Sequence, residues 1–554
     1  MQQLGMIVGP RSLSLLAFVR GLTSNNLLKP LGNSVLPVWN GSFLLLGLCF
    51  FLFCPPLLFS QPNPQSRKVT EKFFPDVDLN IQTPAFQKKK GFTKYEELMA
   101  FLQAYVDAYP DLVQLSFIGK SQKGKEIPLL LLSRPSEEEK VKVWIQAGMH
   151  GNEPASTEGI LHLLDQLLTE ETYQALLDRL EVAIVPMVNI DGYEKQNRYA
   201  ANGLDLNRDQ TKLMAQESIS LKQAYSEFEA EVAMDFHEYR PYRKDFAKMS
   251  TYGISSIYDA MFLYSGNLNV PENLRHFTKE AFVIPATQAM DQHQLRHHDY
   301  MSTTKHRGEI HFNQGSINAR SSATSYALTN TISCLFEIRG VGIGRTSFKR
   351  RVFTTFLLAS SFLQSAYDNL AQIKQEIQQA NTSQQEAYVQ SKKHVSKQAI
   401  QAIDLDKNEE ITLEVSIRDA WKSTATLSRD RPTAYLILPD QKAVIEKLSI
   451  LGLSIERLTE EKSLPVEQYH ITEYQKSSSL YEGIHQQFVS TQTSSTTHTF
   501  PIGTAIVYLD QQKSNLAIEV LEPEAPNSFV TFEVIETKKE AILPIYRYLQ
   551  PNRI

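Results

Sequence analysis

The chain has 554 residues, of which 42% are hydrophobic, 21% charged and 10% aromatic. This composition supplies enough apolar material for a large core and excludes a globally disordered protein. At roughly 100–200 residues per domain, the length leaves room for two to four domains. The net charge of −5 offers no basic surplus that would attract nucleic acid, so we expect no nucleic-acid partner.

An apolar run at 43–59 dominates the N-terminal region. Its uninterrupted part, 43–54, has the length of a signal-peptide core and is shorter than the roughly 20 residues that span a membrane. Pro55 and Pro56 would break a helix there, and no acidic residue precedes the run. We therefore predict that 1–60 is a signal peptide and that the protein is exported, periplasmic or extracellular. The alternative is an uncleaved N-terminal anchor, in which case the membrane is also a partner.

Apolar strand patterns alternate with helical patterns over residues 92–380. The preceding stretch, 61–91, is polar and contains prolines, which is typical of a leader or linker. Strands are predicted at 113–117, 127–133, 141–147, 182–188, 231–236 and 332–338, and helices at 95–109, 155–168 and 353–380. This alternation predicts a three-layer α/β/α sandwich around a mixed sheet.

The last third of the chain differs in composition and in hydrophobic pattern. Residues 381–407 are rich in Gln, Ser and Lys and are predicted to be a linker or an exposed helix. From 408 to 554 short alternating segments predict a smaller, β-rich accessory domain. The segments 517–522 and 528–535 are among its predicted strands, and a helix is predicted at 441–451.

Zinc-ligand residue types follow two of the predicted strands. His150 and Glu153, in the string HGNE, come after the strand at 141–147, and His237 ends the strand at 231–236. Imidazole nitrogen and carboxylate oxygen bind zinc at about 2.0–2.2 Å, and a catalytic zinc keeps three protein ligands with one open position. Taken singly, each has an ordinary explanation. About one H-x-x-E pair is expected by chance, and a strand-end histidine is often held by its neighbours.

Glu337 places a carboxylate in an otherwise apolar strand, in the string SCLFEIRG. Such a group is costly to bury unless it is paired or protonated. Burial would raise its pKa, which suits a base that works near neutral pH. An ion pair with Arg339, on the same face of the strand, is the structural alternative.

The run 197–209 combines two arginines with several side-chain amides, including Arg198, Asn207 and Arg208. Arginine binds a carboxylate as a rigid bidentate fork, and fixed cationic donors stabilise an oxyanion. A solvated loop is the alternative.

Together and in this order, these features resemble the zinc carboxypeptidase family. The resemblance covers about residues 92–375. It rests on HGNEP, on VPMVNIDGY at 185–193, on RYAANGLDLNRD at 198–209, on His237 and on the FE of 336–337. It implies a three-layer α/β/α fold and hydrolysis of the C-terminal residue from peptides with a free C-terminal carboxylate.

The resemblance also implies a role for each matching residue. Three residues would hold one Zn²⁺ per chain: His150, Glu153 and His237. Arg198 would polarise the scissile carbonyl, and Asn207 with Arg208 would grip the C-terminal carboxylate. Glu337 would deprotonate the zinc-bound water and pass the proton to the leaving amine.

One departure concerns a tyrosine that digestive members carry about twenty residues before the catalytic glutamate. Here the first tyrosine in that window is Tyr326, eleven residues before Glu337. Either Tyr326 binds substrate from a different place or the role is absent. Arg320, in the same stretch, would favour an acidic terminal side chain, unless it pairs with an Asp or Glu of the chain itself.

Two other functions stay open on this basis. Related deacylases use the same ligands to cleave N-acyl amino acids, and some family members trim cell-wall peptides. A catalytically inactive peptide-binding homologue is the second. The intact ligand set and Glu337 argue against it.

Overall fold

The computed structural model describes residues 65–243, 246 and 253–554. The predicted signal peptide or anchor at 1–60 lies outside these residues. Within the described part, no helix combines the length and the apolar character needed to cross a membrane.

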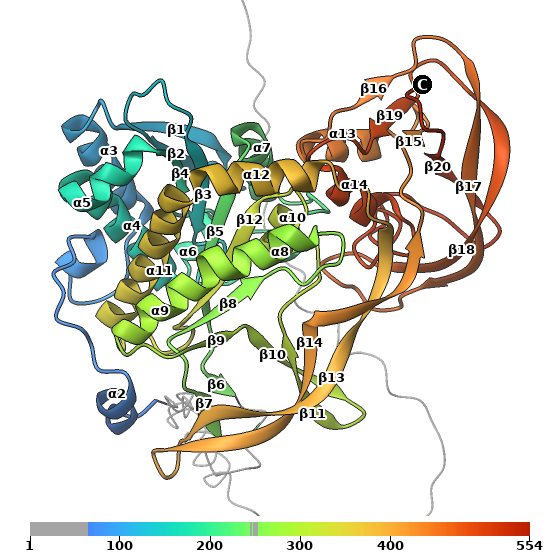
Figure 1. Ribbon diagram of the computed structural model, residues 1–554. Coiled ribbons are helices and arrows are strands. Elements are labelled where there is room, and N and C mark those ends of the chain that lie inside the picture. The colour runs from blue at the N-terminus through green and yellow to red at the C-terminus, as the bar shows by residue number, and fades with distance from the viewer. Residues whose placement is uncertain (1–64, 244–245, 247–252) are drawn as a thin grey trace, which may run out of the picture. The chain divides into compact units, whose positions relative to one another are not determined.

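A mixed sheet of eight strands forms the centre of the region around 92–380, as predicted (Figure 1). Strands β4, β3, β5 and β12 run parallel to one another. The pairs β1–β2, β2–β4 and β8–β12 are antiparallel, and β9 is parallel to β8. In spatial order the strands are β1 (Val113–Lys120), β2 (Glu126–Leu132), β4 (Leu180–Val185), β3 (Val141–Ala147), β5 (Val232–Tyr239), β12 (Ile332–Arg339), β8 (Ala260–Tyr264) and β9 (His297–Asp299).

Helices cover both faces of this sheet. Every residue of β5 is buried, which requires a covering layer on each side because successive side chains point to opposite faces. The helices are α3 (Tyr95–Ala108), α4 (Pro154–Thr169), α5 (Glu171–Gln174), α6 (Ile190–Tyr193), α7 (Gln216–Phe228), α8 (Glu272–Thr278), α9 (Ile284–Gln292), α10 (Ser322–Ala327), α11 (Phe348–Asp368) and α12 (Leu370–Asn381). The three-layer arrangement is the predicted one.

Part of the expected leader is packed against the region around 92–380. Residues 65–91 contain α2 (Arg67–Phe73) and the short helix η1 (Pro84–Gln87). The guanidinium of Arg339 lies 3.9 Å from the ring centre of Phe74 and donates to Gln65. The segment was expected to be a linker because most of its residues are polar. A few of its apolar residues, among them Phe74 and Ile81, are nevertheless buried.

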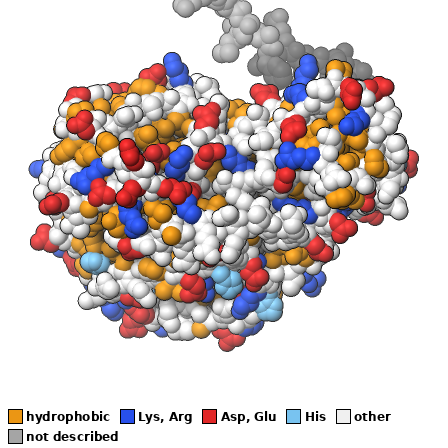
Figure 2. All heavy atoms as spheres, turned by 45° about the horizontal axis from the view of Figure 1, so that its top comes forward, with side chains coloured by type: hydrophobic (Ala, Val, Ile, Leu, Met, Phe, Trp, Pro, Cys, Tyr) orange, Lys and Arg blue, Asp and Glu red, His pale blue; other side chains and the backbone are white. Residues whose placement is uncertain are grey.

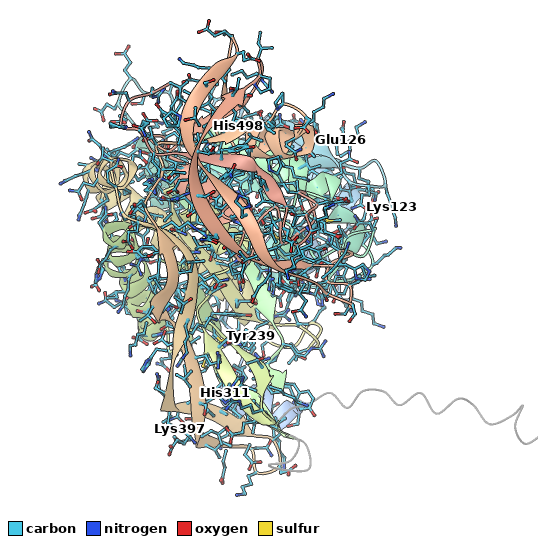
Figure 3. All side chains as sticks on the ribbon, turned by 90° about the vertical axis from the view of Figure 1, so that its right-hand side faces the viewer. Lys123, Glu126, Tyr239, His311, Lys397 and His498 are labelled. Atoms are coloured by element: carbon cyan, nitrogen blue, oxygen red, sulfur yellow. The ribbon has the colours of Figure 1, made fainter. Side chains whose placement is uncertain are left out.

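A second six-stranded sheet joins segments that lie far apart in the sequence. Its order is β10 (Met301–His306), β11 (Glu309–Gln314), β14 (Glu409–Arg429), β13 (Ala387–Asp404), β7 (Ile254–Ser256) and β6 (Tyr242–Arg243). Tyr239, at the end of β5, donates to Ser256 of β7 at 3.2 Å and so connects the two sheets. Figure 3 labels Tyr239 together with His311 of β11 and Lys397 of β13.

Most of the expected linker at 381–407 is therefore sheet, because β13 occupies 387–404. Strands β13 and β14 form a long antiparallel pair (Figure 1). Along much of β13 both faces are partly or fully exposed. The sequence consequently lacks the apolar alternation from which a strand is predicted.

The third sheet belongs to the C-terminal region and carries His498 in Figure 3. Its order is β16 (Glu456–Arg457), β19 (Ala505–Tyr508), β15 (Ala434–Ile437), β20 (Ile542–Tyr548), β17 (Lys462–Lys476) and β18 (Gln487–Phe500), and α13 (Lys442–Ile450) confirms the predicted helix. Two predicted strands are wrong. Residues 517–522 belong to helix α14 (Ser514–Leu521), and 528–535 form turns. Helix α14 is buried all round, which removes the polar face that would have marked it.

Candidate active site

The central sheet brings three predicted site residues to one edge. In the parallel pair β5–β12, His237 and Glu337 are direct register partners. Strand β3 pairs with the other side of β5, and His150 follows its last residue by three positions. The turn between β3 and α4 needs a glycine at 151, where a side chain would collide with the backbone of Gly192 at 2.1 Å.

His150, Glu153 and His237 form one buried cluster whose ligand atoms all lie within 4.8 Å of one another. Nδ1 of His237 lies 2.9 Å from both Nδ1 of His150 and Oε2 of Glu153, and Nδ1 of His150 lies 2.9 Å from Oε1 of Glu153. Burial opposes ionisation of Glu153, but the two histidines hold its pKa well below the usual range.

Two aspartates fix how the imidazoles face. Nε2 of His150 lies 3.0 Å from Asp205, and Nε2 of His237 lies 2.9 Å from Asp235. A ring that donates its Nε2 proton to a carboxylate keeps a lone pair on Nδ1. Both lone pairs therefore point toward the Glu153 carboxylate, which is the donor set that a zinc ion requires. Glu238, the residue after His237, does not orient the ring but pairs with Arg351.

Glu337 is close enough to this cluster for its ionisation to respond to it. Burial, and then the neighbouring Glu153 carboxylate, raise the pKa of Glu337 to about 7. The alternative ion pair with Arg339 does not form, since that guanidinium binds Gln65, Ser255 and the carbonyl of Ser256.

Arg198, Asn207 and Arg208 lie at the same cavity, which has a volume of about 530 Å³ and is also lined by His150 and Glu337. Nη2 of Arg198 donates to Asp205 at 2.9 Å, and Nη1 lies 3.5 Å from Oε1 of Glu153. The backbone N–H of Ser322 donates to Asn207 Oδ1 at 2.9 Å. This contact ties the 197–209 run to the first residue of α10.

Tyr326 is not part of the cavity, so its expected role in binding substrate is corrected. It is fully buried, its hydroxyl donates to Gln146 at 2.8 Å, and its ring stacks on Tyr225. It lies on the buried helix α10, where an aromatic side chain packs into the core. Tyr300 does line the cavity, and burial, followed by the Glu337 carboxylate, raises its pKa.

Three contributors to the site escaped the sequence interpretation. Asp205 carried a signal, because it stands in the matched NGLDLNRD string. Lys393 of β13 lines the cavity from a segment expected to be linker. Glu482, between β17 and β18, accepts a hydrogen bond from the backbone N–H of Asp205 at 3.0 Å. Neither of the last two lies near any motif.

Comparison with known proteins agrees with this geometry. Residues 98–373 match the family model described as zinc carboxypeptidase. Residues 98–373 belong to the zinc carboxypeptidase family. The metallocarboxypeptidase class and the zinc cofactor expected from the sequence are thereby confirmed.

Curated relatives extend the similarity beyond this carboxypeptidase domain. Carboxypeptidase 2 of Trichophyton rubrum is 27% identical over 503 residues, covering 86% of this chain and 92% of its own length, and that of Trichophyton tonsurans is 26% identical over 499 residues with the same coverage. Only 97 residues precede the family match, so the similarity continues into the C-terminal region. Carboxypeptidase M of Mus musculus is 32% identical over 129 residues, covering 20% of this chain and 29% of its own length.

Among solved structures, a metallo-carboxypeptidase from Burkholderia cenocepacia aligns over 50% of this chain and 69% of its own, with 19% identity and a TM-score of 0.39. This overall likeness is weak, and the family assignment does not depend on it.

Proposed function

We propose that this enzyme removes the C-terminal residue of peptides that carry a free terminal carboxylate, with zinc held by His150, Glu153 and His237. One observation carries the proposal. Two imidazole lone pairs and a buried carboxylate converge beside a glutamate with a raised pKa, and His150, Glu337 and Arg208 line one cavity. A zinc ion in such a site supplies Lewis-acid activation of water and of the carbonyl oxygen.

Glu337 is the proposed proton carrier. Its carboxylate takes a proton from the attacking water and later delivers it to the nitrogen of the leaving residue. The raised pKa of Glu337, caused first by its burial, supports the second step because it makes the protonated form more accessible.

The two arginines bind the two groups of the substrate that carry negative charge, the scissile carbonyl oxygen in the transition state and the terminal carboxylate. Arg198, held by Asp205, donates to the scissile carbonyl oxygen as negative charge develops there. Asn207 and Arg208 hold the terminal carboxylate. An internal peptide bond offers no carboxylate to this pair, which restricts cleavage to the last residue.

We further propose that the catalytic unit spans 92–380, that 408–554 is an accessory region, and that the protein is exported through the N-terminal segment at 1–60. The apolar run at 43–59, which has the length of a signal-peptide core, supports export. Detection of the mature N-terminus by sequencing protein from the culture medium or periplasm would test cleavage.

A comparison of matched substrates tests the activity. The zinc-loaded enzyme is expected to shorten a peptide with a free C-terminus by one residue and to leave the C-terminally amidated peptide intact. Equal cleavage of the amidated peptide would contradict an exopeptidase. Cleavage of N-acyl amino acids but of neither peptide would favour a deacylase.

The variant E337Q tests the assigned base. It should lower kcat/KM by about 10²–10⁴-fold while the zinc content stays at one per chain. E126Q, which alters an exposed residue of β2 labelled in Figure 3, is the matched control and should behave as the wild type.

A further inference from the structure

The lining of the active-site cavity carries more positive charge than the proposed reaction uses. Six of its residues are cationic: Arg198, Arg208, Arg240, Arg243, Arg320 and Lys393. Its acidic residues are Glu238 and Glu337. Arg198 is paired with Asp205, and Glu238 is paired with Arg351. Within the described residues, the other five cations form no ion pair with a carboxylate.

The excess of positive charge is confined to the cavity lining and is not seen on the face in Figure 2. On the face of the molecule in Figure 2, acidic and basic side chains are interspersed, in keeping with a chain whose net charge is −5. A cavity wall of like charges enclosed by protein focuses an electric field that attracts anions.

The segment that carries Arg320 is bonded to the proposed site for the terminal carboxylate. Its carbonyl accepts from the backbone N–H of Gln210 at 3.2 Å, and Ser322, two residues on, donates to Asn207. These bonds hold Arg320 next to the Asn207–Arg208 pair.

The Arg320 guanidinium is held in place but is incompletely hydrogen-bonded. It lies 4.9 Å from the ring centre of Tyr481, which steadies its plane. Its Nε is buried and has no hydrogen-bond partner among the described residues. Burial lowers the pKa of Arg320 and Arg208 lowers it further, against the opposing influence of Tyr481, Glu482 and Asp205. The sequence left open whether Arg320 pairs with an acid of its own chain, and no described carboxylate forms that ion pair.

We propose that the pocket for the terminal side chain selects a carboxylate, so that the preferred substrates end in glutamate or aspartate. This inference rests on the proposed carboxypeptidase activity and names its substrate class. Arg208 binds the terminal carboxylate and Arg320 binds the side-chain carboxylate as a bidentate partner. Arg243 and Lys393 add positive charge to the same lining, and all four repel a terminal lysine or arginine.

Isosteric substrates separate charge from shape. Peptides that differ only in a terminal Glu, Gln, Leu or Lys are compared by kcat/KM at pH 7 and low salt. We expect Glu to exceed Gln by tenfold or more, with Lys the poorest. In R320Q the Glu-to-Gln ratio should fall to about one. R307Q, which removes an exposed arginine in the turn between β10 and β11, should retain the wild-type ratio.

Two results would overturn the inference. One is cleavage of the Gln or Leu peptide as efficient as that of the Glu peptide, and the other is a Glu preference that survives in R320Q. Either result leaves the carboxypeptidase activity itself intact.

If no peptide is cleaved, the proposed function is wrong. A binding experiment then tests the preference for an acidic side chain by itself. Calorimetric titration of zinc-loaded E337Q with N-acetyl dipeptides ending in Glu or Gln should give at least tenfold tighter binding of Glu. Equal binding would refute the acidic pocket.

Discussion

The carboxylate of Asp205 lies 3.0 Å from Nε2 of His150, on the side of the ring that faces away from Glu153. This contact fixes the tautomer that leaves Nδ1 free to bind metal. We expect D205N to weaken zinc binding by about 10–100-fold. Competition with a chromogenic chelator measures the affinity, and D107N, on the exposed side of α3, serves as control. Unchanged zinc affinity would show that His150 does not depend on Asp205.

Glu482 supports the same aspartate from the C-terminal region, through the backbone N–H of Asp205. E482A should weaken zinc binding less than D205N does, because it removes a contact one step further from the metal. The double variant should be no worse than D205N alone, since residues in one network are not additive. Fully additive losses in zinc affinity would mean that Glu482 acts independently of Asp205.

Tyr326 provides a test that separates structure from catalysis. Y326F removes a hydroxyl that donates to Gln146, and Gln146 Oε1 keeps a second donor in Trp144 Nε1. The free energy of unfolding should therefore fall by only about 0.5–1.5 kcal/mol. The values of kcat and KM should stay within about twofold of the wild type. A large loss of kcat at unchanged stability would show that Tyr326 takes part in catalysis.

Stability should also depend on pH through Glu519 of α14. Burial raises the pKa of this carboxyl to about 7 from its usual 4.5, and the amides of Asn267 and Asn269 bind it at 2.6 and 3.0 Å. Because the folded state holds the proton more tightly, this contribution is full below pH 4.5 and is lost as pH rises through 7.

Between pH 5 and pH 8 the loss from Glu519 amounts to roughly 2–3 kcal/mol. E519Q cannot ionise and should remove that part of the pH dependence. Denaturant unfolding of both proteins at the two pH values measures it. An identical pH dependence in the two proteins would contradict the assignment.

The sequence predicted the central sheet well because its strands are buried on both faces and read as continuous apolar runs. The three proposed zinc ligands and Glu337 stood out because they interrupt or follow those runs. The same reasoning misplaced Tyr326, since distance along the chain from Glu337 does not reveal which way a helix residue faces. It missed Lys393, which lies in a stretch rich in Gln, Ser and Lys, and Glu482, which lies in a loop that carries no motif. Long-range contacts place Lys393 in the cavity lining and Glu482 against the backbone of Asp205.

The pairing of β14 with β11 and of β13 with β7 has a consequence for how the protein is made. The two central strands of the second sheet, one of which carries Lys393, are synthesised after the whole segment matched by the family model. Until residue 429 has left the ribosome, β11 and β7 present open edges to other chains. The cavity wall includes Lys393, which lies beyond the matched segment 98–373. A fragment limited to that segment therefore cannot form the complete cavity.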